Sequence, residues 1–303
     1  MEKLEKILNA AITEKTRQNM IRKSDFVDDV QLINGGIPLF SWIDISLTEL
    51  CNRQCSFCPR FDKNLYPNQK LHMGMGLIQK IRDELVSLNY QGGVVFCGYG
   101  EPLLHPEILN IIKIFGHDVR TEIVSNGDYL KPDVITKLFD AGLSFLCVSM
   151  YDGPEQVEKF TKMFAEAGIS NDKFILRDRW HSGEDGFGIK LTNRGGVLNN
   201  TGVVPTTIEF KNTVRPCHYL AYSLAIDWNG DMLLCVQDWA KKVKLGNVFS
   251  DTLLGVWLSP RMKRLRTELI QGKRDKSPCK ECDADGTLHG FNHVNAWINI
   301  EED

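Results

Sequence analysis

Short apolar runs alternate with amphipathic segments through the middle of the chain. The apolar runs cover residues 37–48, 92–100, 119–127, 143–151 and 172–177. The segments with helical spacing cover residues 105–116, 131–142 and 153–168, and they begin near proline or follow glycine. Alternation of this kind predicts a parallel sheet with right-handed helical crossovers.

The pattern changes on both sides of this region. Up to about residue 30, acids and bases alternate at helical spacing and predict an amphipathic helix. After Arg177 the chain is rich in Gly, Asn and Asp and too short for two more β/α units. Further on, YSLAIDWNGDMLLCV predicts two antiparallel strands around an Asn229-Gly230 turn, and residues 252–272 predict one or two helices.

We therefore expect an α/β chain in three parts. Residues 1–36 would form a helical extension, residues 37–205 a partial (β/α) TIM-like barrel of five or six parallel strands, and residues 206–303 a small α+β domain packed across its open side. In parallel sheets, functional residues gather at the carboxyl ends of the strands. Here those ends carry Cys51 and the motifs CGYGE, SNG, SMYDG and RDRW.

Composition and charge limit the classes of partner and the compartment that we expect for this protein. The chain has 303 residues, is 43% hydrophobic and 25% charged, and has a formal net charge of −3. This balance does not favour a nucleic acid or an anionic membrane as partner, and no apolar run approaches the roughly 18 residues of a membrane span. Since the amino terminus lacks the pattern of a signal peptide, we expect a cytoplasmic protein whose nine cysteines are reduced.

Three of these cysteines, Cys51, Cys55 and Cys58, lie within the short sequence CNRQCSFC. Thiolates hold iron–sulfur clusters, and three of them on a four-iron cubane leave one iron open for another ligand. The spacing alone also suits a zinc knuckle.

The motifs around the three cysteines favour the iron–sulfur cluster over the zinc knuckle. The Cys-x3-Cys-x2-Cys spacing, the aromatic Phe57 before the last cysteine and the motif GYGEP (Gly98, Tyr99, Gly100, Glu101, Pro102) together resemble the radical SAM superfamily. The resemblance covers residues from about 40 to 180.

The resemblance implies that a [4Fe–4S] cluster binds S-adenosylmethionine (SAM) and cleaves it to a 5′-deoxyadenosyl radical, which removes hydrogen from substrate. It also implies a set of cofactor-binding residues. Gly98 and Gly100 would let the backbone approach the methionyl group, and Glu101 would contact its amino group. The remaining residues of this set are Phe57, Tyr99, Ser125, Asn126, Ser149 and Arg177, the last as a partner of the SAM carboxylate.

Four more cysteines lie near the carboxyl terminus: Cys217, Cys235, Cys279 and Cys282. Four soft ligands suit either Zn²⁺ or an iron–sulfur cluster. The arrangement resembles the twitch domain, a shortened SPASM domain of radical SAM enzymes, and so implies an auxiliary [4Fe–4S] cluster with an electron-accepting or structural role. The other two cysteines, Cys97 and Cys147, fall on predicted strands, where free cysteine behaves as a small apolar residue unless it serves as a hydrogen donor.

The overall layout is most similar to radical SAM aminocyclitol dehydrogenases. That resemblance implies a small-molecule substrate (a sugar, nucleotide sugar or aminocyclitol) whose alcohol is oxidised to a ketone, with the auxiliary cluster as electron acceptor and flavodoxin or ferredoxin as electron donor. His181 and Asp185 are our candidates for the catalytic base. Three further residues after the fifth strand are candidates for substrate contact: Trp180, Asn193 and Arg194.

Other functions stay open. A radical epimerase would use Cys97 or Cys147 as a thiol hydrogen donor. A peptide-modifying maturase would share both clusters, but many maturases carry a recognition domain that this amino terminus is too short to hold. A molybdopterin-pathway cyclase has three auxiliary cysteines and a Gly-Gly tail, whereas this chain has four and ends in NIEED. The intact cysteine and GYGEP motifs argue against a binding protein with a decayed barrel.

Overall fold

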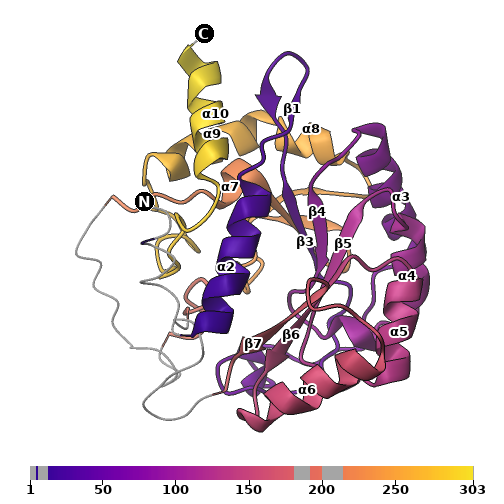
Figure 1. Cartoon of the computed structure of the whole chain (residues 1–303). Coiled ribbons are helices and arrows are strands. Elements are labelled where there is room, and N and C mark those ends of the chain that lie inside the picture. The colour runs from indigo at the N-terminus through magenta and orange to yellow at the C-terminus, as the bar shows by residue number, and fades with distance from the viewer. Residues whose placement is uncertain (1–4, 6–12, 181–191, 200–213, 303) are drawn as a thin grey trace.

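The computed structural model describes residues 5, 13–180, 192–199 and 214–302 (Figure 1). Both candidate bases, His181 and Asp185, lie outside these ranges. None of the described helices is long and apolar enough to cross a membrane.

Eight strands form the main sheet, in the order β10-β9-β8-β3-β4-β5-β6-β7. They are β3 (Trp42–Ile45), β4 (Gly93–Phe96), β5 (Arg120–Ser125), β6 (Phe145–Met150), β7 (Phe174–Asp178), β8 (Ser223–Ile226), β9 (Asp231–Leu233) and β10 (Lys244–Asn247). All neighbours from β8 through β3 to β7 pair in parallel, which confirms the predicted α/β class with six parallel strands. Within the described residues the sheet stays open, with β7 and β10 as its edges.

Helices follow most strands of the sheet. They are α2 (Glu14–Val27), α3 (Met75–Ser87), α4 (Ile108–Phe115), α5 (Pro132–Asp140), α6 (Glu155–Glu166), α7 (Tyr219–Tyr222), α8 (Leu253–Trp257), α9 (Pro260–Ile270) and α10 (Phe291–Glu302). Two 3₁₀ turns, η1 (Pro59–Phe61) and η2 (Pro102–Leu104), and a small hairpin of β1 (Leu32–Ile33) and β2 (Ile37–Pro38) complete the set. The last helix, α10, was not among the predicted elements.

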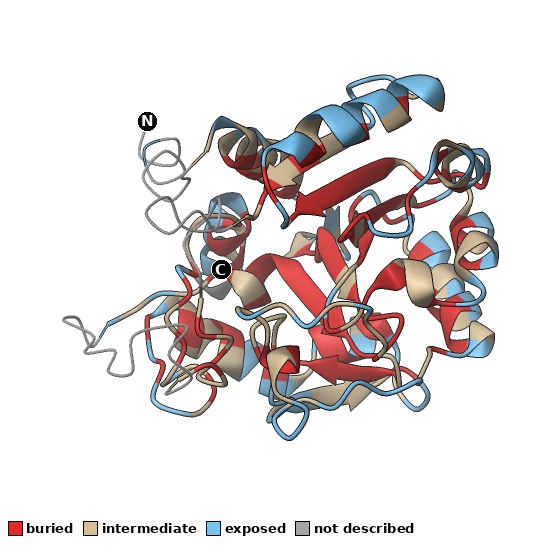
Figure 2. Ribbon diagram, turned by 90° about the horizontal axis from the view of Figure 1, so that it is seen from below, coloured by how far each residue is buried: buried red, intermediate tan, exposed pale blue. Residues whose placement is uncertain are grey.

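Helices α3 to α6 lie along the outer face of the sheet (Figure 1). Side chains alternate along a strand, and the outward residues, such as Ile43, Phe96 and Val148, belong to one large core with the apolar stripes of these helices. Figure 2 shows the consequence: the strands are buried, while the helices expose their far sides. Burial of this apolar face is the main term that holds the β/α units together.

Helix α2 covers the opposite face, which we call the inner face of the sheet (the face that carries Trp42 and Val95). The rings of Phe26 and Trp42 meet edge to face with their centroids 5.9 Å apart. Arg22 forms an ion pair of 2.7 Å with Glu122, a carboxylate that is only 1% exposed. The predicted amino-terminal helix therefore packs against the sheet.

The hairpin of β8 and β9 turns at Asn229-Gly230, as its sequence predicted, but its location differs from our expectation. β8 pairs in parallel with β3, in register from Trp42 opposite Ser223 to Ile45 opposite Ile226. The carboxyl-terminal strands thus extend the sheet instead of packing across its open side. Pairing with β3 satisfies backbone groups that an edge strand would leave open.

Candidate functional site

The loop with Cys51, Cys55 and Cys58 follows β3 at the carboxyl end of the sheet. The Asn68 side chain holds Cys51 at both backbone groups: its Oδ1 accepts from the Cys51 N–H at 2.9 Å, and its Nδ2 donates to the Cys51 carbonyl at 2.9 Å. The Cys58 N–H donates to the Cys55 carbonyl at 2.9 Å, which forms a tight turn. These bonds fix the loop independently of its thiols.

Two polar residues between the cysteines fasten the loop to neighbouring strands. Asn52 accepts a 2.8 Å hydrogen bond from the Asn126 side chain, which follows β5. Arg53 bonds Asp128 at 2.6 Å and Asp152 at 2.7 Å, so that it spans the ends of β5 and β6. The roles of Asn52 and Arg53 were not predicted from the sequence, because only the fold brings their partners near them.

The three thiols lie close enough to influence one another. Burial raises the pKa of each, and in Cys55, where the pKa rises to about 12, the neighbouring Cys58 and Cys51 raise it further. A free thiol would therefore stay protonated at neutral pH, whereas bound iron would favour the thiolate. The loop fits a three-thiolate cluster. Phe57 packs against Tyr151, with ring centroids 5.4 Å apart.

The glycines of the GYGEP motif are required by the protein's own packing. A Cβ on Gly100 would lie 2.2 Å from the Thr48 carbonyl oxygen and 2.7 Å from that of Leu50, so this strand end can approach the start of the cysteine loop only without a side chain. Gly98 has φ +104, a conformation that favours glycine. Tyr99 is buried and packs edge to face on Trp239, at 4.8 Å between centroids.

Glu101 joins the ends of β4 and β5. Its carboxylate accepts hydrogen bonds from the Ser125 hydroxyl at 2.8 Å, the Asn126 N–H at 2.9 Å and the Leu103 N–H at 3.2 Å. Burial raises its pKa to about 7, although these three bonds lower it. Three of the predicted cofactor-binding residues, Glu101, Ser125 and Asn126, therefore form one hydrogen-bonded group.

Ser149 and Arg177 form a second group of predicted residues. They face each other on β6 and β7, and an Arg177 Nη2 donates to the Ser149 hydroxyl at 2.6 Å. In the part of the chain described, the Nε of Arg177 is buried without a hydrogen-bond partner. Since buried donors are normally paired, this nitrogen suits an anionic group such as a carboxylate.

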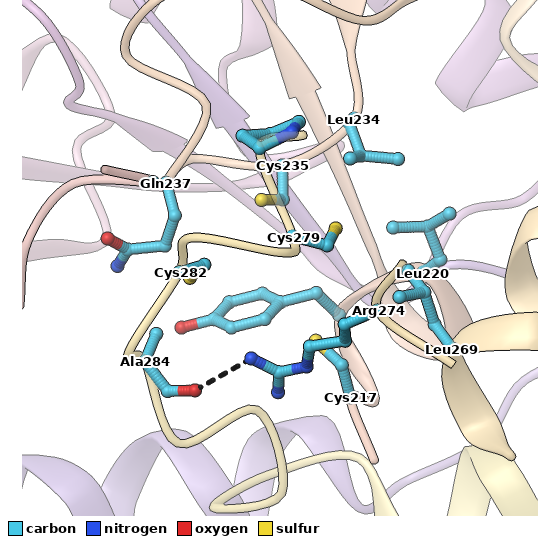
Figure 3. A pocket seen from close by; sticks show the side chains of 13 residues that line it. Cys217, Leu220, Leu234, Cys235, Gln237, Leu269, Arg274, Cys279, Cys282 and Ala284 are labelled. Carbon is cyan, nitrogen blue, oxygen red and sulfur yellow. Dashed lines mark hydrogen bonds between the residues drawn. The ribbon is translucent and has the colours of Figure 1, made fainter. Parts of the chain in front are cut away.

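The four carboxyl-terminal cysteines line a single small cavity (Figure 3). Cys217 precedes α7, Cys235 follows β9, and Cys279 and Cys282 belong to one loop after α9. Burial raises the pKa of all four thiols, as at the first loop. The β8–β9 hairpin thus brings Cys235 to the same cavity as Cys217.

Two arginines hold the walls of this cavity. Arg274, which is 6% exposed, donates to the carbonyls of Arg215 and Pro216, each at 2.8 Å. Arg215 in turn donates to the carbonyls of Cys282 at 2.8 Å and Cys279 at 3.2 Å. The guanidinium of Arg274 also lowers the pKa of Cys217, Cys279 and Cys282, against the larger effect of burial. This positive charge would stabilise a cluster of thiolates.

The donor arrangement suits a cluster better than one zinc ion. Among the residues that the structure describes, no three His, Cys, Asp or Glu side chains form a group fit for a single metal ion. Zinc requires four ligands at about 2.0–2.3 Å from one centre, and the four cysteines that line this cavity do not form such a group. The four thiols therefore fit a cubane, which spreads its ligands over four irons.

The other candidates have ordinary structural partners. Asn193 is fully buried. Its side chain donates a hydrogen bond to the Glu281 carbonyl at 2.6 Å and accepts one from the Asp283 N–H at 3.3 Å, so it supports the Cys279–Cys282 loop. Arg194 lies 6.0 Å from the ring of Trp239, and Trp180 packs against the main core. Cys147 is buried on β6.

Family comparison identifies both cysteine regions. Residues 45–174 match the Radical SAM superfamily. Residues 217–283, from Cys217 to just beyond Cys282, match SPASM, an iron–sulfur cluster-binding domain.

Individual relatives give the same picture. The S-adenosyl-L-methionine-dependent 2-deoxy-scyllo-inosamine dehydrogenase of Niallia circulans is 28% identical over 251 residues, which are 80% of this chain and 93% of that protein. A GTP 3′,8-cyclase of Aquifex aeolicus is 29% identical over 201 residues, 61% of this chain and 58% of the relative. Among solved structures, BtrN in complex with AdoMet and 2-DOIA superposes with a TM-score of 0.67 at 24% identity, over 84% of this chain and 98% of that one, which shows the fold.

The three-cysteine loop lies within the region that matches the Radical SAM superfamily, and the four-cysteine cavity lies within the region that matches SPASM, so the chain contains a radical SAM region and an auxiliary iron–sulfur cluster-binding region.

Proposed function

We propose that this protein is a radical SAM dehydrogenase that oxidises an alcohol of an aminocyclitol, or of a closely related sugar, to a ketone. One observation carries the proposal: a three-thiol loop and a separate four-thiol cavity lie on one sheet, with Tyr99 and Trp239 packed together between their segments. Four protein thiols would saturate a cubane, so this site suits electron transfer rather than substrate ligation. The Niallia circulans relative, matched over 93% of its length, supports the substrate class.

The bound cofactors supply the radical chemistry: a hydrogen-atom acceptor derived from SAM at the first cluster and a one-electron acceptor at the auxiliary cluster. The chain's own residues position the reactants. The carboxylate of Glu101 would accept a hydrogen bond from the amino group of SAM. The Nε of Arg177, which has no hydrogen-bond partner among the described residues, would donate one to the SAM carboxylate. Phe57 and Tyr151 would shield the cysteine loop from water.

The electron donor and the location belong to the same proposal. A low-potential carrier such as flavodoxin or ferredoxin would reduce the first cluster, and both carriers are cytoplasmic proteins.

The experiment uses anaerobically reconstituted protein and 2-deoxy-scyllo-inosamine deuterated in turn at each carbinol carbon. We expect about eight irons per chain, deuterium in 5′-deoxyadenosine from one labelled position, and a ketone product. Cys51→Ala should abolish 5′-deoxyadenosine, whereas Cys279→Ala should retain it and lose the ketone. Absence of deuterium transfer from every position would overturn the substrate proposal.

A second candidate, radical epimerisation, is favoured by Cys97. This thiol is partly exposed on the inner face and donates to Asp44 at 3.2 Å. An epimerase would return a hydrogen atom from this thiol to the substrate radical. Solvent deuterium in recovered substrate, lost in Cys97→Ala, would favour epimerisation over dehydrogenation.

A further inference from the structure

Asp44 is a carboxylate on the inner face of β3 that none of the roles above uses. The Trp42 indole N–H donates to its Oδ1 at 3.1 Å, and the Cys97 thiol donates to the same oxygen at 3.2 Å. Among the described residues we find no hydrogen bond to its Oδ2. One oxygen is therefore fixed by the protein, and the other remains able to accept a proton.

The side chain lies in a hollow between the two cysteine regions. Asp44 and Ser46 of the β3 segment line this hollow together with Gly98 of the GYGEP motif. Leu233 and Val236 line it from the other side, and Val236 directly follows Cys235 of the auxiliary cavity. This hollow is small, and a hydroxyl group of a substrate placed in it would touch the SAM-side motif on one wall and the auxiliary-cysteine segment on the other, which is the position that the proposed reaction requires of the reacting hydroxyl.

The charges around Asp44 suit a base. Lys23 of α2 lies over the Trp42 ring, at 4.4 Å from Nζ to the ring centroid, and its charge favours the ionised carboxylate. Burial raises the pKa of Asp44, Glu122 of β5 raises it further, and Lys23, Cys97 and Trp42 lower it. A carboxylate with a raised pKa is a stronger proton acceptor than one in water.

The neighbouring groups are poorer acceptors. The charge of Lys23 favours the ionised carboxylate of Asp44, although burial lowers the pKa of Lys23 itself. Burial and the Asp44 charge raise the pKa of Cys97, so that it stays a thiol and acts as a donor. Asp44 is thus the acceptor within this group.

We propose that Asp44 is the general base that accepts the hydroxyl proton of the carbinol being oxidised. This inference rests on the proposed function and deepens it. Removal of one hydrogen atom from the carbinol carbon leaves a neutral ketyl radical. Transfer of its O–H proton to the Oδ2 of Asp44 gives the ketyl radical anion, and departure of one electron to a one-electron acceptor completes the C=O bond. The substrate loses two electrons and two protons in total, of which Asp44 receives one.

The test compares Asp44→Asn with wild type as reconstituted holoenzyme. The probe is 2-deoxy-scyllo-inosamine deuterated at the reacting carbon. Since general-base catalysis contributes roughly 10²–10⁴-fold, we expect the ketone yield per turnover to fall by at least about 100-fold. Deuterium transfer to 5′-deoxyadenosine should persist, because it precedes the proton transfer. Substrate affinity measured by calorimetry should change by less than about threefold, since the amide keeps the shape of the side chain.

Two further variants serve as a control and as an alternative test of Asp44. Asp133→Asn makes the same change at an exposed carboxylate of α5 that pairs only with Lys137 in the described residues, and it should leave the ratio of ketone to transferred deuterium unchanged. Asp44→Glu displaces the carboxylate by one methylene and should lower this ratio less than the amide does, which keeps the inference testable if Asp44→Asn does not fold.

The results that would overturn the role of Asp44 differ from those that would overturn the proposed function. A ketone yield at the wild-type level in Asp44→Asn overturns the assignment of the base. Loss of substrate affinity and deuterium transfer together, with an unchanged ratio, makes Asp44 a binding residue and also overturns it. If the wild-type protein itself transfers no deuterium from this aminocyclitol, the proposed function fails, and the inference fails with it.

Discussion

Glu101 is the residue whose charge state should respond most directly to pH near neutrality. Its pKa is raised to about 7 by burial, and it is bonded to Ser125 and Asn126. The proposed contact with the amino group of SAM requires the carboxylate. Because a proton must leave Glu101 before this contact can form at low pH, SAM affinity should fall as pH decreases through 7.

The size of the effect follows from the titration. A group with a pKa of about 7 is about one-tenth ionised at pH 6 and about nine-tenths at pH 8, so the contribution of Glu101 to SAM affinity should rise roughly tenfold between them. Calorimetric titration of SAM into the reconstituted protein measures this. The amino group of SAM titrates in the same range, and Glu101→Gln therefore serves as the reference. A variant with the same pH dependence as wild type would contradict the role of Glu101.

Among single residues, the sequence predicts the roles of those, such as cysteine, whose side chains have a characteristic chemistry. Seven cysteines could be assigned to two groups because thiols in a reducing compartment have few other reasons to cluster. Asn68, Asn52 and Arg53 could not be found, because asparagine and arginine are common surface residues. Their roles arise only from contacts such as that of Arg53 with Asp152, 99 positions away in sequence.

Among the elements, the short segment after the Cys279–Cys282 loop packs closely against Cys217. Gly286 pairs with Cys217 as an isolated β-bridge, and its carbonyl accepts the His218 N–H at 2.8 Å. A Cβ at this position would lie 2.5 Å from the Cys217 sulfur and 2.7 Å from an Arg274 Nη2. Gly286→Ala should therefore displace one cluster ligand and reduce the iron content from about eight to about four per chain.

Iron analysis of the reconstituted variant, with spectra of the reduced clusters, measures this effect. Gly76→Ala is the matched control, since a Cβ there meets nothing within 4 Å and alanine favours the surrounding helix α3. SAM cleavage should survive in both variants because the first cysteine loop is untouched. A full complement of iron in Gly286→Ala would show that Cys217 can move without losing the cluster.

The sequence determines whether a segment becomes a helix or a strand more directly than it determines where that segment lies in the sheet. Strands β4 to β7 and helices α4 to α6 were predicted because each is a local apolar pattern bounded by Gly or Pro. The position of β8 beside β3 was not, because strand neighbours are chosen by the fit of whole faces across about 180 residues of intervening chain. The hairpin pattern specified two strands but carried no information on which edge they join.

The whole molecule is connected by a buried charge network that joins the first cysteine loop to the carboxyl-terminal strands. Glu49, which is 2% exposed, pairs with Arg60 at 3.0 Å and accepts from the Tyr66 hydroxyl at 3.1 Å. It also pairs with Lys241, which bonds Asp227 after β8 at 2.6 Å. The two cysteine regions therefore share one set of ion pairs, which should make them unfold together.

Glu49→Gln tests this coupling at the scale of the fold. Loss of the carboxylate leaves Arg60, itself 3% exposed, buried without its counter-charge, and breaking such a pair typically costs about 3–5 kcal/mol. We expect a lower denaturation midpoint in a single transition, with faster hydrogen exchange both in residues 49–61 and in residues 238–242. Asp133→Asn, which removes the acid of an exposed pair with Lys137, should change neither. Faster exchange confined to residues 49–61 would mean that the two regions are stabilised separately, because a shared network cannot lose its central carboxylate on one side alone.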